Sequence, residues 1–339
     1  MTIGSSQVTP AGTAGAKEWA RENIRGLWVS MFGPIKGNDE VDEEGIRIGV
    51  QRALQLEIGG LSYQSLFEYW SSTHAERRRG AEILLEEVGG RKPVYVNITD
   101  HSIKETVRFG EHALKHGASV LLLQVPYEHA KSEEHIFEFF RYVCERLDGP
   151  IALYNTPHAG LELSVDLIDR LADIENICAL KNGYFNSAHS DAVFKKSGDR
   201  LVISHAIESE YLRHIRKNGQ QALFATSSTH IMQSPGWQPI AEYQRLAQAG
   251  RFDEAERVAA ELQPLRAMWD SIYKRVLEKN EHPIAYMKYW QELMGIPGGP
   301  PRPPLQPLTA EEKAFLRKSI AQSGLAEKLG MAERLLETA

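Results

Sequence analysis

Two short apolar segments of the chain each end in a residue that can do chemistry. One begins at Ile151 and leads into Tyr154, and the other begins at Cys178 and leads into Lys181. Burying an ammonium group at the end of an apolar strand is costly unless the group is paired or neutralised. Desolvation lowers a lysine pKa and makes the amine nucleophilic, which is what Schiff-base chemistry requires. A tyrosine on a neighbouring strand could carry the protons that this reaction moves.

Each of these residues also has a simpler explanation. A lysine at a strand end is often an exposed terminus, and a tyrosine in an apolar segment often only packs. The chemical hypothesis for Lys181 and Tyr154 therefore depends on whether the fold brings the two side chains together.

The elements that must position this pair follow a repeated pattern. Short apolar runs alternate with longer amphipathic stretches, which is typical of β/α units. The predicted strands are Leu27–Phe32, Gly59–Tyr63, Pro93–Ile98, Ser119–Val125, Ile151–Tyr154, Cys178–Lys181, Leu201–His205 and Ala222–Thr226. The predicted helices include Glu43–Leu56, Thr73–Glu87, Ile103–His116, Glu133–Leu147, Ser164–Ala172 and Glu208–Lys217.

Eight strands alternating with helices predict an α/β fold, a (β/α)8 TIM barrel, with an open doubly wound sheet as the alternative. No G-x-G-x-x-G motif or P-loop supports a nucleotide-binding fold. In a barrel the active site lies at the carboxyl ends of the strands, where Tyr154 and Lys181 fall.

Three regions are expected along the chain. Residues 1–18 are predicted to be a flexible tail, residues 19–235 the barrel, and residues 236–339 a helical C-terminal extension. The extension contains helical patterns at Ile240–Leu262, Leu265–Leu277, Pro283–Met294 and Ala310–Glu337. The start of the chain lacks the basic and apolar regions of a signal peptide, and no apolar run is long enough to span a membrane. We expect a cytoplasmic protein.

The composition excludes some classes of function. The net charge is −6, with acids and bases scattered, which argues against nucleic acid as a partner because phosphate binding needs a concentrated basic face. The two cysteines, Cys144 and Cys178, form neither a disulfide framework nor a metal cluster. His112 and His116 are interpreted as sharing an outer helix face. We expect no catalytic metal and no cofactor.

Several ordered segments then point to a known family. They are Leu153-Tyr154-Asn155-Thr156-Pro157, Ala179-Leu180-Lys181, Pro126-Tyr127, and the stretch from His282-Pro283-Ile284 to Leu305. Over roughly residues 24–325 the chain resembles the dihydrodipicolinate synthase / N-acetylneuraminate lyase family of class I aldolases. The resemblance implies a barrel with a C-terminal helical domain, assembled as a homo-oligomer, a dimer or more usually a homotetramer. It also implies an imine between Lys181 and a 2-oxo acid such as pyruvate, with Tyr154 as general acid and base.

The chain departs from the family at three loops. Where the family usually carries Gly-Thr-Thr-Gly-Glu after the second strand, this chain has Ser65-Leu66-Phe67-Glu68, without the paired hydroxyls that bind the substrate carboxylate. Where the family often has Pro-Tyr-Tyr, this chain has Pro126-Tyr127-Glu128. True dihydrodipicolinate synthases place an arginine after the fifth strand, where this chain has His158. The candidate substrate-binding residues are Ser65, Glu68, Tyr127, Glu128, His158, His205 and Thr226.

These departures favour a lyase that makes or breaks a C–C bond through the Lys181 imine, on a small carbonyl substrate other than that of dihydrodipicolinate synthase itself. A Schiff-base dehydratase of a 2-keto-3-deoxy sugar acid is the second hypothesis. A catalytically silent ligand-binding paralogue is the third, and the retention of Tyr154 and Lys181 together speaks against it.

Overall fold

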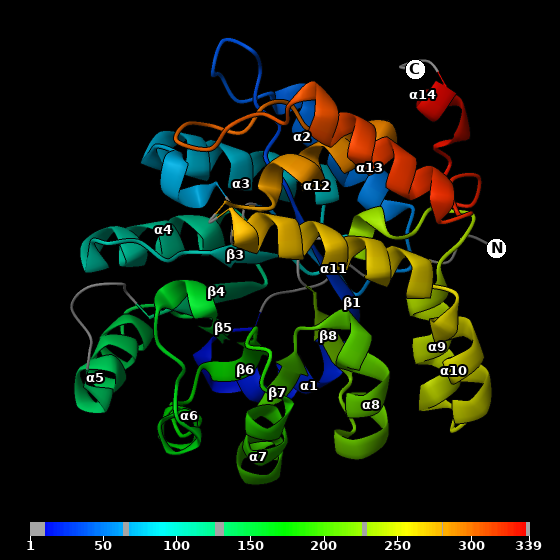
Figure 1. Ribbon diagram of the computed structural model, residues 1–339. Helices are drawn as coiled ribbons and strands as arrows, with labels where there is room; N and C mark the ends of the chain where they lie inside the picture. The colour runs from blue at the N-terminus through cyan, green and yellow to red at the C-terminus, as the bar shows by residue number, and fades with distance from the viewer. Residues whose placement is uncertain (1–10, 64–67, 126–131, 226–228, 280, 337–339) are drawn as a thin grey trace, which may run out of the picture.

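The computed structural model describes residues 11–63, 68–125, 132–225, 229–279 and 281–336. Its eight strands run parallel, and β1 pairs with both β2 and β8 while β3 to β7 pair in sequence order. A bridge between Leu61 and Val94 joins β2 to β3, and β7 lies against β8, so the sheet closes on itself. The strands are β1 Gly26–Met31, β2 Gly60–Tyr63, β3 Tyr95–Asn97, β4 Val120–Gln124, β5 Ile151–Asn155, β6 Ile177–Asn182, β7 Val202–His205 and β8 Ala222–Phe224. The predicted barrel and its eight strands are confirmed (Figure 1).

Helices surround the barrel, one after each strand. They are α2 Glu43–Leu54, α3 His74–Val88, α4 Ile103–Lys115, α5 Glu133–Cys144, α6 Val165–Leu171, α7 Ser187–Ser197, α8 Glu208–Asn218 and α9 Pro239–Gln248. The six helices predicted between strands are confirmed to within a few residues at their ends. Helix α7 is not in the prediction, because its buried positions are Ser190, Val193 and Ser197, of which only one is apolar.

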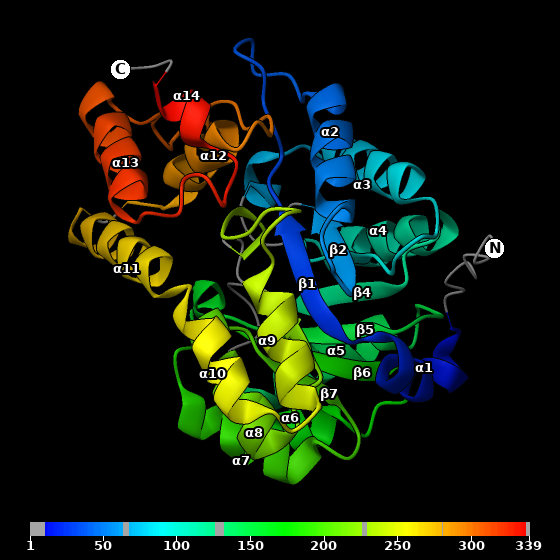
Figure 2. The same ribbon diagram turned by 90° about the vertical axis from the view of Figure 1, so that its right-hand side faces the viewer.

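The region boundaries differ from the prediction at both ends. Helix α1 (Ala16–Asn23) begins inside the range predicted to be a flexible tail, and its Trp19 and Ala20 are buried against the barrel interior. Helix α9 packs on α8 and β1, so it is the eighth helix of the outer ring rather than part of the C-terminal extension. Figure 2 shows α1 across the end where the strands begin.

The C-terminal helices are α10 Phe252–Ala260, α11 Gln263–Glu278, α12 Ile284–Leu293, α13 Ala310–Gln322 and α14 Ala332–Leu336. The predicted continuous helices over residues 240–262 and 310–337 are therefore wrong. Gly250 and Gly324, with positive φ angles of 77° and 71°, follow the ends of α9 and α13, and Gly330, with a φ of 70°, lies in the turn before α14. Figure 2 shows α11, α12 and α13 grouped on the side toward which the β1 arrow points.

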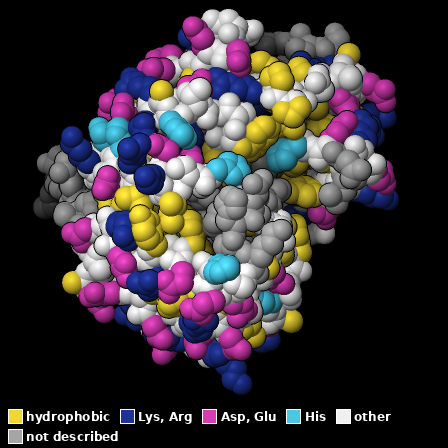
Figure 3. All heavy atoms as spheres, turned by 90° about the vertical axis from the view of Figure 1, so that its left-hand side faces the viewer, with side chains coloured by type: hydrophobic (Ala, Val, Ile, Leu, Met, Phe, Trp, Pro, Cys, Tyr) yellow, Lys and Arg dark blue, Asp and Glu magenta, His cyan; other side chains and the backbone are white. Residues whose placement is uncertain are grey.

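Side chains alternate between the barrel interior and the helix layer, as parallel strands require. Trp28, Tyr95 and Phe224 fill the interior as an aromatic cluster, with ring centres 5.2 to 5.9 Å apart. Acidic and basic side chains are intermixed over the face in Figure 3, which shows no segregated basic surface there. Among the described residues, no helix has the length and apolar character needed to cross a membrane.

Candidate active site

Tyr154 and Lys181 lie side by side near the carboxyl ends of their strands. The register of β5 against β6 pairs Tyr154 with Lys181. The Lys181 Nζ atom is 4.7 Å from the centre of the Tyr154 ring, and both side chains are buried. The fold thus brings together the two residues that the sequence could only suggest separately.

A pair of amides fixes this arrangement from behind. Asn155 and Asn182 directly follow the tyrosine and the lysine and face the helix layer, where Asn155 Nδ2 donates to Asn182 Oδ1 at 2.8 Å. Asn182 Nδ2 also donates to Ser190 Oγ of α7 at 2.8 Å, and Asn155 Oδ1 accepts from the Leu163 backbone N–H at 2.9 Å. The Nδ2 and Oδ1 groups of both amides thus all take part in this network, which ties the two strand ends to each other and to α7.

Polar side chains occupy interior positions on four further strands around Lys181 and Tyr154. Ser204 is paired in register with Lys181, Gln124 with Tyr154, and Ser30 with Ser62. Each of these four residues is buried. The Ser62 hydroxyl has no hydrogen-bond partner among the described residues, so it is free to bind a polar group in the lumen.

Tyr95 is a second phenol beside the lysine. Its ring centre is 5.8 Å from Lys181 Nζ, and its side chain is fully buried in the interior cluster. Its hydroxyl makes no hydrogen bond of normal geometry with the described residues. The sequence-based prediction of the site did not include Tyr95. Its place between Val94 and Val96 in the third strand could have indicated that its side chain lies on the opposite face of the strand from theirs.

The electrostatics of Lys181 differ from the expectation. Burial by itself lowers the pKa of the ammonium, but the phenol groups of Tyr95 and Tyr154 act in the opposite direction, and the net pKa is raised. The expectation that desolvation leaves a lysine of lowered pKa is therefore wrong for this structure. The Nζ atom also approaches the Ala225 carbonyl oxygen at 3.4 Å. The amine must lose a proton before it can act as a nucleophile, and the two phenols are the titratable groups beside it.

Glu68 is placed where both of its carboxylate oxygens contact protein. Oε1 accepts from Lys288 Nζ of α12, and Oε2 accepts from the Gly33 backbone N–H at 3.0 Å. Lys288 also donates to the Gly33 and Pro300 carbonyl oxygens, at 2.8 and 3.1 Å. Both charged side chains are buried. The geometry gives Glu68 a role in holding the segment after β2 to the C-terminal region, instead of the predicted direct contact with substrate.

His205 faces away from the barrel interior. Its Nδ1 atom is 2.8 Å from Ser190 Oγ of α7, and its ring stacks on His214 of α8 with centres 4.5 Å apart. Burial, with a further contribution from His214, lowers the pKa of His205 to about 4. Because strand residues alternate, Ser204 takes the interior position and His205 the exterior one. The prediction that His205 binds substrate therefore does not fit its position.

The remaining predicted substrate-binding residues cannot be placed. Ser65, Tyr127, Glu128 and Thr226 lie outside the described residues. His158 belongs to the short helix Pro157–Ala159 after β5, but its side chain lies outside the description as well.

The C-terminal helix α11 brings one more residue near the pair. Burial raises the pKa of Tyr273, and the nearby Tyr154 raises it further, which places the two phenols within electrostatic reach. Trp269 packs edge-to-face on Tyr273, with ring centres 5.3 Å apart. Sequence patterns could not reveal this proximity, because Tyr273 and Tyr154 are more than a hundred positions apart.

Comparison with known proteins agrees with this geometry. The model of the Dihydrodipicolinate synthetase family matches residues 23–323. The chain is 28% identical to 4-hydroxy-tetrahydrodipicolinate synthase of Methanothrix thermoacetophila, over 88% of this chain and 97% of that protein. It is 27% identical to the enzyme of the same name from Methanopyrus kandleri, over 91% and 99%.

Solved structures with the same fold include two with TM-scores of 0.76. Dihydrodipicolinate synthase from Aquifex aeolicus is 24% identical and covers 89% of this chain and 99% of its own. YagE from E. coli K12, described as a member of the dihydrodipicolinic acid synthase family in complex with pyruvate, is 20% identical and covers 91% and 99%. At these identities the two structures show the fold.

Proposed function

Because the chain belongs to the dihydrodipicolinate synthetase family of class I aldolases and lyases, we propose that Lys181 forms its Schiff base and that Tyr154 transfers the protons. The proposed reaction makes or breaks the C–C bond between the carbon adjacent to the carbonyl carbon of a 2-oxo acid and a second carbonyl compound. The observation that carries this proposal is the juxtaposition of Tyr154 and Lys181, with Nζ 4.7 Å from the phenol ring in a buried polar layer.

The chemistry follows from these positions. The deprotonated Lys181 amine attacks the substrate carbonyl carbon, and the carbonyl oxygen takes up a proton to give a carbinolamine. Loss of that hydroxyl as water then forms the imine, which withdraws electrons from the neighbouring C–C or C–H bond. Tyr154 is the nearest ring to Nζ and supplies and removes the protons. Tyr95, whose ring centre is 5.8 Å from Nζ, is proposed to assist the loss of the first proton.

A 2-oxo acid fits as the substrate class for two reasons. A family structure is described in complex with pyruvate. In this chain, Ser62 presents a buried hydroxyl without a partner among the described residues, which can donate to a carboxylate oxygen.

We propose further that the second substrate differs from that of dihydrodipicolinate synthase. The sequence has His158 where those enzymes carry an arginine, and it lacks the paired hydroxyls after β2.

Borohydride trapping tests the imine. The protein is incubated with pyruvate and sodium borohydride, and the digested peptides are analysed by mass spectrometry. We expect a reduced adduct on Lys181, no adduct in Lys181→Met, and an unchanged adduct in the control Lys274→Met, which removes an exposed lysine of α11. An absence of adduct on Lys181 across a panel of 2-oxo acids and aldehydes refutes the proposal.

Product analysis tests the reaction type. Release of two carbonyl fragments, or their condensation, supports C–C bond chemistry, whereas loss of water alone identifies the dehydratase. Efficient formation of 4-hydroxy-tetrahydrodipicolinate would refute the proposed difference in the second substrate.

A further inference from the structure

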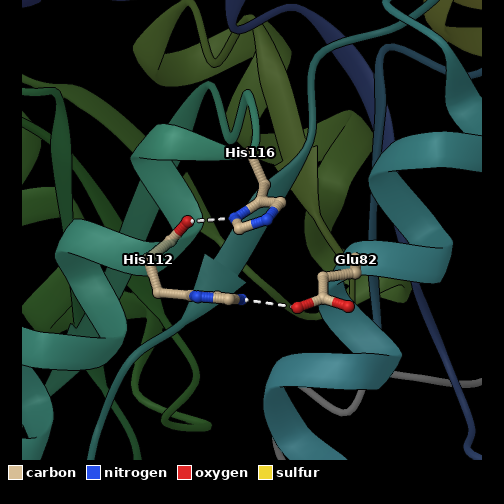
Figure 4. A group of neighbouring side chains, drawn as sticks. All are labelled: Glu82, His112 and His116. Carbon is tan, nitrogen blue, oxygen red and sulfur yellow. Dashed lines mark hydrogen bonds and ion pairs between the residues drawn. The ribbon is translucent and has the colours of Figure 1, made fainter.

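A group of metal-ligating side chains lies in the helix layer, outside the site described above. Glu82 of α3 and His112 and His116 of α4 each direct one possible ligand atom toward the others, and these atoms all lie within 4.8 Å of one another (Figure 4). We propose that these three residues form a binding site for one zinc-type transition-metal ion.

The two histidines share one face of α4. They are four positions apart, which places them one helical turn from each other, and their ring centres are 4.2 Å apart. His116 is exposed, so solvent and metal ions reach the group from its side. Two imidazoles one turn apart and a carboxylate from a second helix are ligands that zinc prefers, with a remaining position for water.

The hydrogen bond of His116 sets its ring for metal binding. Its Nδ1 atom is 2.8 Å from the His112 carbonyl oxygen, as Figure 4 shows. Because a carbonyl oxygen only accepts, Nδ1 carries the proton, and the Nε2 lone pair is available as a ligand. A backbone carbonyl on one imidazole nitrogen is the usual outer partner of a metal-bound histidine.

His112 and Glu82 already face each other. The His112 Nε2 atom is 3.0 Å from Glu82 Oε1. Metal binding needs the lone pair of His112 Nε2, so a proton carried there moves to Nδ1 of the same ring through solvent when the ion binds.

The surrounding charges limit the affinity. Arg79 Nη1 is 3.4 Å from Glu82 Oε2, which leaves Oε1 to face the histidines but adds a positive charge nearby. Arg78, the preceding residue of α3, adds a second positive charge on this helix. With three protein ligands and two nearby cations, the site suits a reversibly bound ion that ties α3 to α4.

The position of the group separates it from catalysis. His116 lies at the end of α4, which returns toward the side of the barrel where the strands begin, whereas Lys181 lies near their carboxyl ends. Binding of metal is therefore expected to change stability and to leave the reaction at Lys181 unaffected.

Zinc titration by isothermal calorimetry on tag-free, metal-stripped protein tests the site. We expect one equivalent of zinc to bind. The affinity should fall at least ~10-fold in Glu82→Gln, His112→Gln and His116→Gln, because even the loss of a residue that only supports a metal ligand can lower metal affinity by that factor. The control His135→Gln removes an exposed histidine of α5 and should bind zinc as the wild type does.

Thermal unfolding supplies a second readout. The midpoint should rise with zinc in the wild type and in His135→Gln, but not in His116→Gln, whose exposed side chain can be replaced without unfolding the helix. Magnesium should leave the midpoint unchanged, because it prefers oxygen ligands. Less than one equivalent of bound zinc, or equal affinity in His116→Gln and wild type, overturns the proposal.

Discussion

Removing one partner of the buried ion pair between Glu68 and Lys288 should be among the most destabilising single substitutions in the chain. Removing one partner of such a pair leaves an uncompensated buried charge and costs about 3–5 kcal/mol. In Lys288→Met, the Glu68 carboxylate keeps, among the described residues, the Gly33 N–H as its donor, so we expect a loss of unfolding free energy of about 5 kcal/mol. In Glu68→Gln, the ammonium keeps the Gly33 and Pro300 carbonyls, and the expected loss is nearer to about 3 kcal/mol.

The assay is urea unfolding followed by circular dichroism, with a double-mutant cycle. The double variant Glu68→Gln/Lys288→Met buries no charge at this position, so it should lose less than the sum of the single variants. The control is Glu138→Gln, which breaks the exposed pair with Arg141 and should cost less than about 1 kcal/mol. Strict additivity, or a loss in Glu68→Gln no larger than in the control, would show that the pair does not stabilise the fold in this way.

Three further predictions concern the site and its surroundings. Tyr154→Phe should lower kcat, measured by steady-state kinetics, by about 10²–10⁴-fold without changing the unfolding midpoint. An unchanged kcat in a variant with the wild-type midpoint would contradict the role of Tyr154 in proton transfer. Tyr95→Phe should lower the pKa of Lys181, because it removes one of the phenols that raise it, and the pH profile of imine trapping should then shift to lower pH. The histidine at 205 has a folded pKa of about 4 against about 6.5 when unfolded, so the unfolded state binds more protons between these values. The free energy of unfolding should therefore fall as the pH drops from about 6.5 to about 4, and urea midpoints across this range should be flatter in His205→Asn than in the wild type.

Much of the fold was predictable because the pattern of apolar and polar residues within each segment indicates whether it forms a strand or a helix. The position of Tyr154 and Lys181 at adjacent strand ends also followed, since successive strands of a barrel are neighbours. The face on which a residue lies was harder: His205 is one position beyond Ser204, and a single step along a strand moves a side chain from the interior to the helix layer.

Contacts between distant segments could not be predicted at all. Lys288 reaches Glu68 across 220 positions, and nothing local in either segment indicates the other. Tyr95 was overlooked for a different reason. A tyrosine between two valines indicates a core residue, and only its distance to Lys181 shows that it belongs to the site.

The amide pair behind the reacting residues has a consequence for how such a barrel can change its substrate. Asn155 and Asn182 anchor Tyr154 and Lys181 through contacts with each other, with Ser190 of α7 and with the Leu163 backbone. Side chains at the mouth of the barrel that do not touch these amides can therefore be exchanged while the amine and the phenol keep their spacing. A library that varies such positions, on a background with both asparagines and Glu68 fixed, is the natural starting point for redirecting this enzyme to new carbonyl compounds.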